Sequence, residues 1–113
     1  MTTLLPTDAD NNPIPAMRLK PGGAHKINAT ATTARNAAAF DTDTKVVSVY
    51  ASGPVYLRFG NASVTAANTD HYYPGNTYYD FAISGGDNKG PHSTHLAVLA
   101  AAADCAVYVS EKE

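Results

Sequence analysis

Val-Tyr-Leu-Arg-Phe-Gly-Asn, residues 55–61, is the stretch that decides the fold class of this chain. Between residues 55 and 59 its most apolar side chains occupy every second position, which is the period of a β-strand with one buried face. The valine, leucine and phenylalanine are expected on one face of the strand, and the tyrosine and arginine on the other. The Gly-Asn pair that follows is a turn signal. The stretch therefore predicts a half-buried strand that ends in a turn.

Similar stretches recur on both sides of this strand. Residues 26–32 alternate apolar and polar side chains, and residues 45–50 are rich in β-branched residues. Turn residues separate the stretches, as in Ser-Gly-Pro at 52–54 and Pro-Gly-Asn at 74–76. Strands are predicted at residues 26–32, 45–50, 55–59, 77–84, 95–100 and 105–109.

Two alanine-rich segments, residues 35–40 and 96–103, are ambiguous. Alanine favours a helix in isolation, but a helix of six residues without a clear cap is marginal. In the second segment Leu96, Val98 and Ala100 alternate in the manner of a strand. We expect an edge strand in the first segment and a strand in the second.

The number and spacing of these strands indicate the fold class. The chain has 113 residues, which fits one domain. It contains 20 alanines and no tryptophan, so its core is expected to rest on a few Val, Ile, Leu, Tyr and Phe side chains. Short strands at regular spacing are typical of sandwiches. The predicted fold is all-β: a small β-sandwich or jelly roll of about six to eight antiparallel strands with an extended N-terminal arm.

Residues 1–24 are expected to form this arm, and residues 25–113 the sandwich. Four prolines in the arm fix φ and remove backbone donors, so extended conformations are favoured over a regular strand. A disordered tail seldom contains as many apolar residues. The arm is therefore expected to lie across its own body or a neighbouring chain, with an ordinary terminus packed on its own domain as the alternative. Its candidate partner-binding residues are Leu4, Leu5, Ile14, Met17 and Leu19.

Charge and hydropathy exclude several classes of partner. The net charge of −2 leaves no basic face able to neutralise many phosphates, so no nucleic-acid partner is expected. No apolar stretch approaches the ~20 residues that a membrane helix needs, and no signal peptide is visible. The single cysteine, Cys105, excludes an internal disulfide. A soluble protein made in a cytoplasm, with no membrane partner, is expected.

No catalytic, cofactor or metal site is predicted. Two residues separate His92 from His95, so on a strand their imidazoles would point to opposite faces, unlike a metal-binding His-X-His pair. Cys105 lies within a strand beside Asp104, which would raise a thiol pKa instead of lowering it. The glycine-rich residues 85–90 lack the Gly-Lys-Ser/Thr ending of a phosphate-binding loop. The chain is not expected to be an enzyme.

The most unusual local feature is aromatic. Residues 71–81, His-Tyr-Tyr-Pro-Gly-Asn-Thr-Tyr-Tyr-Asp-Phe, place Tyr72, Tyr73, Tyr78 and Tyr79 around one tight turn. Alternate residues of a hairpin face outward, so one or two of these tyrosines are expected to be exposed. Exposed tyrosines are enriched at protein interfaces, and they also stack on sugar rings. Ordinary cross-strand pairing is the third possibility.

The order of strand types along the chain resembles that of small virion proteins of tailed phages. Residues 45–52 and 55–61 are followed by a Pro-Gly turn and an aromatic strand within 74–84. An alanine-rich strand at 95–100 and a Val-Tyr-Val strand at 105–110 complete the series. The chain is most similar to jelly-roll capsid decoration, or cement, proteins, which staple neighbouring capsid subunits and have no enzymatic activity.

This resemblance implies the major capsid protein as a partner, together with neighbouring copies of the chain in a dimer or trimer. It implies a place on the capsid surface of the virion after synthesis in the host cytoplasm, and it implies no cofactor. A tail, collar or head-fibre base component of the virion is the first alternative. A carbohydrate-binding β-sandwich module that uses the four tyrosines is the second.

Overall fold

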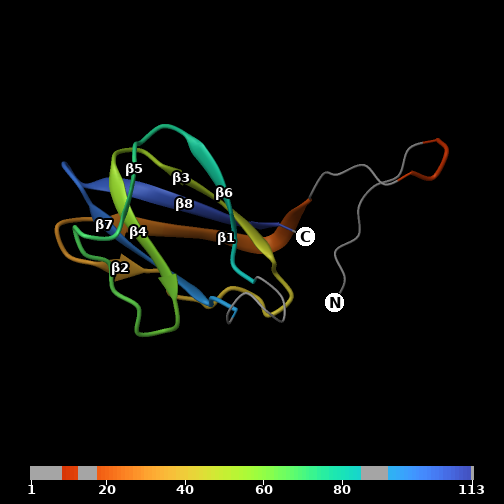
Figure 1. Ribbon diagram of the computed structural model, residues 1–113, viewed down its shortest axis with the longest axis horizontal. Coiled ribbons are helices and arrows are strands. Elements are labelled where there is room, and N and C mark those ends of the chain that lie inside the picture. Colours follow the sequence, from red (N-terminus) through yellow and green to blue (C-terminus); the bar gives the residue numbers. More distant parts are fainter. Residues whose placement is uncertain (1–8, 13–17, 85–91, 113) are drawn as a thin grey trace.

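The computed structural model describes residues 9–12, 18–84 and 92–112 (Figure 1). Within these residues the chain forms eight β-strands and no helix. The strands are β1 (Leu19–Ala29), β2 (Ala34–Arg35), β3 (Val46–Ala51), β4 (Val55–Gly60), β5 (His71–Tyr73), β6 (Tyr78–Ala82), β7 (His95–Ala100) and β8 (Cys105–Lys112).

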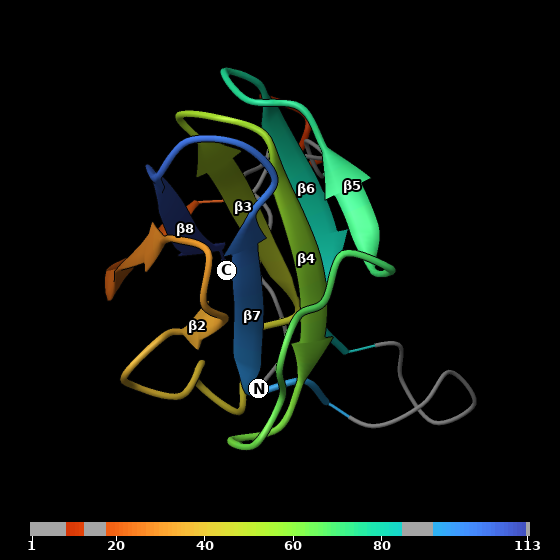
Figure 2. The same cartoon turned by 90° about the vertical axis from the view of Figure 1, so that its left-hand side faces the viewer.

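The strands form two four-stranded sheets that pack face to face. Sheet I has the strand order β1-β8-β3-β6, and sheet II has the order β2-β7-β4-β5. All neighbouring strands are antiparallel. Figure 2 shows sheet II in front of sheet I, with β5 and β6 next to each other where the sheets meet on one side. The expectation of an all-β sandwich is confirmed.

Almost every connection crosses from one sheet to the other. Only β4 and β5, which are consecutive in sequence, lie in the same sheet and pair with each other. Residues 71–81 therefore do not form the expected hairpin, since β5 pairs with β4 in sheet II and β6 pairs with β3 in sheet I. Their Pro-Gly turn is instead part of a crossover between sheets.

The core lies between the two sheets and follows the period-2 alternation of each strand. Sheet I supplies valines from β3 and β8, and sheet II supplies aliphatic side chains from β4 and β7. These fully or almost fully buried residues include Val47, Val49, Val55, Leu57, Leu96, Val98, Val107 and Val109. The core therefore rests on the β-branched and leucine side chains that the sequence predicts.

The N-terminal boundary of the sandwich lies earlier than residue 25. Residues 19–24, which the sequence analysis assigns to the arm, form the first half of β1. Leu19 is paired with Lys112 and Ala24 with Ser110, so β1 contains extra residues at this point and bulges. Gly22 adopts a φ of 74°, which accommodates the bulge and the adjacent Pro21.

The edge strand expected at 35–40 is much shorter than predicted. Only Ala34 and Arg35 pair with β7, as β2. The Asn36 side chain donates to the carbonyl of Ala38 and accepts a hydrogen bond from the Leu96 amide, so it replaces the next step of the strand ladder. Because this asparagine is buried and satisfied, the chain leaves the sheet there and forms a loop over the end of the sandwich.

At the other end of the sandwich, the β5–β6 crossover packs its backbone against that of the β3–β4 turn. A Cβ atom on Gly75, in the β5–β6 crossover, would lie 2.6 Å from the Cα of Gly53 in the β3–β4 turn. The amide of Asn76 also donates to the carbonyl of Ala51 over 2.7 Å. The crossover can lie this close to the turn only because Gly75 lacks a side chain.

Gly75→Ala is expected to lower the free energy of unfolding by about 1–3 kcal/mol, because the added methyl group must push the two backbones apart. Urea denaturation followed by circular dichroism measures the change. Thr77→Ala, an exposed position in the same crossover, is the control and should leave stability almost unchanged. Equal stability of the two variants would contradict the close approach.

Candidate functional site

The four tyrosines of residues 71–81 do not share one surface. Tyr72 and Tyr78 are 56% and 72% exposed, but they lie on the outer faces of different sheets. Tyr73 and Tyr79 are half-buried and contact each other edge-to-face between the sheets, with ring centroids 4.9 Å apart. The crossover thus separates the residues that the sequence analysis groups together.

A row of aromatic side chains crosses the outer face of sheet I. Tyr108 on β8 pairs with Tyr50 on β3, which in turn pairs with Tyr78 on β6. The ring centroids are 6.5 Å apart for Tyr50 and Tyr108 and 4.8 Å apart for Tyr50 and Tyr78. Lys26 on β1 pairs with Tyr108 and places its ammonium 5.8 Å from that ring centroid. We call these four residues the tyrosine row.

The outer face beside the tyrosine row has small side chains and one ion pair. Ser110 and Ser48 pair with each other in the adjacent register row, and Ser48 also pairs with Asp80 on β6. Lys112 bridges to Asp80 with 2.9 Å between Nζ and Oδ1. The hydrogen bond from Lys112 holds the pKa of the Asp80 carboxyl below its ordinary value. Large aromatic side chains next to small ones leave the rings accessible to a partner.

A second, smaller aromatic group lies on the outer face of sheet II. Tyr56 on β4 pairs with Tyr72 on β5, and their rings meet edge-to-face at 5.7 Å. Leu99 on β7 pairs with Tyr56 from the other side. The exposed Arg58 is two positions further along β4 on the same face. We call Tyr56 and Tyr72 the tyrosine pair, and with Arg58 it makes the outer face of the second sheet amphipathic.

Among the described residues, a groove opens at the edge of the sandwich beside the start of β5. Aromatic rings of Phe59, Tyr73 and Phe81, which also contact one another or the core, form part of its wall. The polar part consists of Arg58, Asp70 and His71, and the remaining lining residue is Leu57. Such a set can stack a flat ring against the aromatic side chains and hydrogen-bond its polar substituents.

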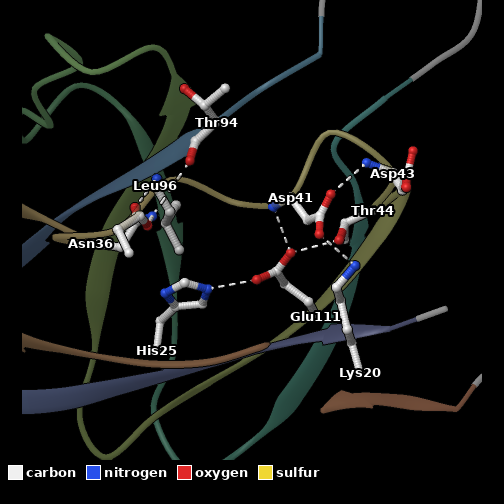
Figure 3. Close-up of polar contacts among 10 residues, drawn as sticks. Lys20, His25, Asn36, Asp41, Asp43, Thr44, Thr94, Leu96 and Glu111 are labelled. Atoms are coloured by element: carbon white, nitrogen blue, oxygen red, sulfur yellow. Dashed lines mark hydrogen bonds and ion pairs between the residues drawn. The ribbon is translucent and has the colours of Figure 1, made fainter. Parts of the chain in front are cut away.

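A buried polar cluster lies between the sheets at the end of the sandwich that the loop between β2 and β3 covers (Figure 3). Glu111 on β8 is 3% exposed and points inward. Its Oε2 accepts a hydrogen bond from His25 Nε2 over 2.8 Å. Its Oε1 accepts hydrogen bonds from Thr44 Oγ1 over 2.6 Å and from the Asp41 amide over 2.8 Å. The carboxylate therefore ties the loop to β1 and β8.

The cluster is extended by a salt bridge and an aromatic contact. Lys20 bridges to Asp41 over 2.8 Å, and Phe40 packs edge-on against the His25 ring at 5.1 Å. Burial alone would raise the pKa of the Glu111 carboxyl, but its hydrogen bonds from Thr44, His25 and the Asp41 amide outweigh this and lower the pKa. With both oxygens occupied, Glu111 holds the loop in place.

The histidines and the cysteine form no metal-binding group in the part of the chain that the structure describes. His95 is buried, and burial, followed by the charges of Arg35 and His25, lowers its pKa. Burial raises the pKa of the Cys105 thiol, and Asp104 adds to this effect, as expected from the sequence. Among the described residues no group of three or more His, Cys, Asp or Glu side chains is placed to hold a metal ion, and no helix is suited to cross a membrane.

Three further tyrosines of these surfaces, Tyr50, Tyr56 and Tyr108, are not among the predicted site residues, although Tyr56 is expected on the outward face of its strand. Each alternates with buried aliphatic residues of its own strand, so the period-2 pattern contains a signal that they face outward. Of the predicted arm residues, Leu19 is 69% exposed at the start of β1. Leu4, Leu5, Ile14 and Met17 lie outside the described residues. No family model, curated protein or solved structure matches this chain.

Glu111→Gln is expected to make unfolding less sensitive to acid. Because folding lowers the pKa of Glu111, its ionised form stabilises the fold above the ordinary pKa of 4.5, and this stability is lost as the pH falls through the lower folded value. At pH 7 the free energy of unfolding of the variant should be lower than that of the wild type by about 1–3 kcal/mol, because the variant loses charge-assisted hydrogen bonds. Below pH 4.5 the difference from the wild type should shrink.

Urea denaturation at pH values from neutral to acidic measures this difference. Asp104→Asn, which removes an exposed carboxylate outside the cluster, is the matched control and should follow the wild type at every pH. If the wild type exceeds Glu111→Gln in free energy of unfolding by the same amount at every pH, Glu111 is not the titrating group.

Proposed function

We propose that this chain is a non-enzymatic structural protein of a tailed-phage virion: a capsid decoration, or cement, protein that binds and stabilises the major capsid protein lattice. It would act at the capsid surface, in contact with the major capsid protein and with neighbouring copies of itself. The resemblance of its strand series to such proteins, the order of strands in the two sheets and the distribution of exposed tyrosines support this proposal.

The strand order supports a jelly roll as the finer description of the sandwich. Jelly rolls contain eight strands in two sheets, arranged as two Greek keys, and they occur in viral capsid and lectin domains. In this chain β8 lies between β1 and β3, and β7 lies between β2 and β4, so the end of the chain inserts between its early strands. That interleaving is the arrangement expected of a jelly roll.

The proposal rests on the observation that exposed tyrosines occupy both outer faces of the sandwich. Sheet I presents Tyr78 and Tyr108, and sheet II presents Tyr72. Tyrosine provides a large contact area at low entropic cost and is enriched among the residues that dominate binding energy. A molecule with such residues on opposite sides is suited to lie between other proteins, as a cement protein must.

The N-terminal arm adds a further contact in this proposal. Leu19 is exposed at the point where the chain enters β1, and apolar residues precede it in the sequence. A segment with Leu4, Leu5, Ile14 and Met17 would bury apolar area on a neighbouring subunit. Many weak contacts repeated over a symmetric shell then give tight binding through avidity without a single deep pocket.

The open groove favours a second candidate function. Its aromatic residues and its polar Arg58, Asp70 and His71 are side chains that bind sugars in carbohydrate modules. The sequence predicts Tyr72, Tyr73, Tyr78 and Tyr79 as the sugar-binding residues of such a module. These residues cannot form one binding platform, because they lie on three different surfaces. A glycan would be bound by Phe59, Tyr73 and Phe81 instead.

A tail, collar or head-fibre base position is the alternative location in the virion.

Co-sedimentation with undecorated phage heads tests the leading proposal. The full chain should sediment with the heads, and Tyr72→Ala should raise the half-saturating concentration about tenfold or more, as expected for loss of a central interface tyrosine. Asn68→Ala, an exposed position in the preceding loop, is the control and should bind like the wild type.

Two other outcomes distinguish the alternatives. Sedimentation with isolated tails but not with heads would replace the capsid position by a tail or collar position. Failure to bind either particle, combined with binding to an immobilised glycan panel that Arg58→Ala abolishes, would replace the virion proposal by the carbohydrate module.

A further inference from the structure

We propose that the tyrosine row is the contact between two copies of this chain, packed with their sheets I face to face. The two-fold axis would run along the strands between β8 and β3. This inference deepens one part of the proposed function, the contact between neighbouring copies of the chain, and it shares the premise that the exposed tyrosines contact protein. It assigns the face of sheet I to a second copy and leaves the tyrosine pair on sheet II for the capsid shell.

The order of residues in the row makes it self-complementary. Lys26, Tyr108, Tyr50 and Tyr78 lie in register across the four strands β1, β8, β3 and β6. A two-fold rotation about an axis between the two central strands exchanges β8 with β3 and β1 with β6. Tyr108 of one copy then faces Tyr50 of the second copy, and the same contact is repeated on the other side of the axis.

The ends of the row carry charges that match under this rotation. Lys26 lies at the β1 end, while Tyr78 and Asp80 lie two positions apart on the same face of β6. In the dimer each Lys26 ammonium would approach the Tyr78 ring and the Asp80 carboxylate of the other copy. The Asp80 side chain is 61% exposed although it already binds Lys112, so it can accept a second donor. Two such contacts form per dimer.

The shape of the face allows the close approach that a sheet-on-sheet contact needs. Ser48 and Ser110 flank the central tyrosines on one side, and Ala106 flanks Tyr108 on the other. Sheets packed face to face lie about 10 Å apart with nearly aligned strands. An axis parallel to the strands produces this alignment. The tyrosine rings are therefore the main groups that fill the space between the two copies.

Charge exchange tests this arrangement in the full-length chain. Sedimentation equilibrium at about 1–100 µM should detect a monomer–dimer equilibrium for the wild type. Lys26→Glu and Asp80→Lys should each raise the dimer dissociation constant about tenfold or more, because each places like charges opposite one another twice. An equimolar mixture of the two variants should dimerise again, since both contacts become attractive in the mixed dimer. The double variant K26E/D80K should also regain self-association.

The controls separate loss of the contact from loss of the fold. Lys45→Glu makes the same charge change at an exposed position outside the row and should leave the dimer intact. Thermal unfolding by circular dichroism confirms that each variant is folded, and restoration in the mixture excludes misfolding as the cause. A monomeric wild type throughout this range, or a mixture that does not dimerise, would overturn the inference. Binding to phage heads is measured separately, so a dimer that ignores heads would contradict the proposed function alone.

Discussion

The pairing register of β8 is the constraint on which both the core and the exposed surface depend. Val107, Val109 and Glu111 point inward from this strand, while Tyr108 and Lys112 point outward. Because side chains alternate, a slip of one residue against β1 and β3 would exchange these two sets. The valines would lose their buried environment, and Tyr108 would leave the tyrosine row. One choice of register therefore serves stability and surface chemistry together.

Glu111 is the unusual member of the inward set. A buried carboxylate is costly unless hydrogen bonds replace its water shell. Here its donors come from two segments of the sequence: His25 on β1, and the Asp41 amide and Thr44 in the loop after β2. Satisfying this one side chain therefore requires the loop after β2 to lie across β1 and β8. The same requirement explains why that loop cannot continue as a regular strand.

Local alternation predicts which parts of this chain form strands and which residues face inward, as in residues 55–59 and 105–109. It does not predict which strands become neighbours. Residues 71–81 contain two strand-like pieces around a Pro-Gly turn, which is the pattern of a hairpin, yet the Gly75 backbone packs on Gly53 and directs the chain into the other sheet. That contact joins residues more than twenty positions apart, so no local pattern contains it. Asn36 ends β2 through Leu96, a partner 60 positions away in the sequence.

The same crossover determines what the tyrosines can do. In a hairpin, Tyr72 and Tyr78 would have formed one compact aromatic patch, suited to a single ligand. Because β5 and β6 belong to different sheets, Tyr73 and Tyr79 instead seal the edge between the sheets, and the exposed members are displayed in opposite directions. Tyr50, Tyr56 and Tyr108 then join them through cross-strand pairing. A topology that separates sequence neighbours thus turns one aromatic cluster into two exposed aromatic faces, which is the arrangement that the proposed position between two partners requires.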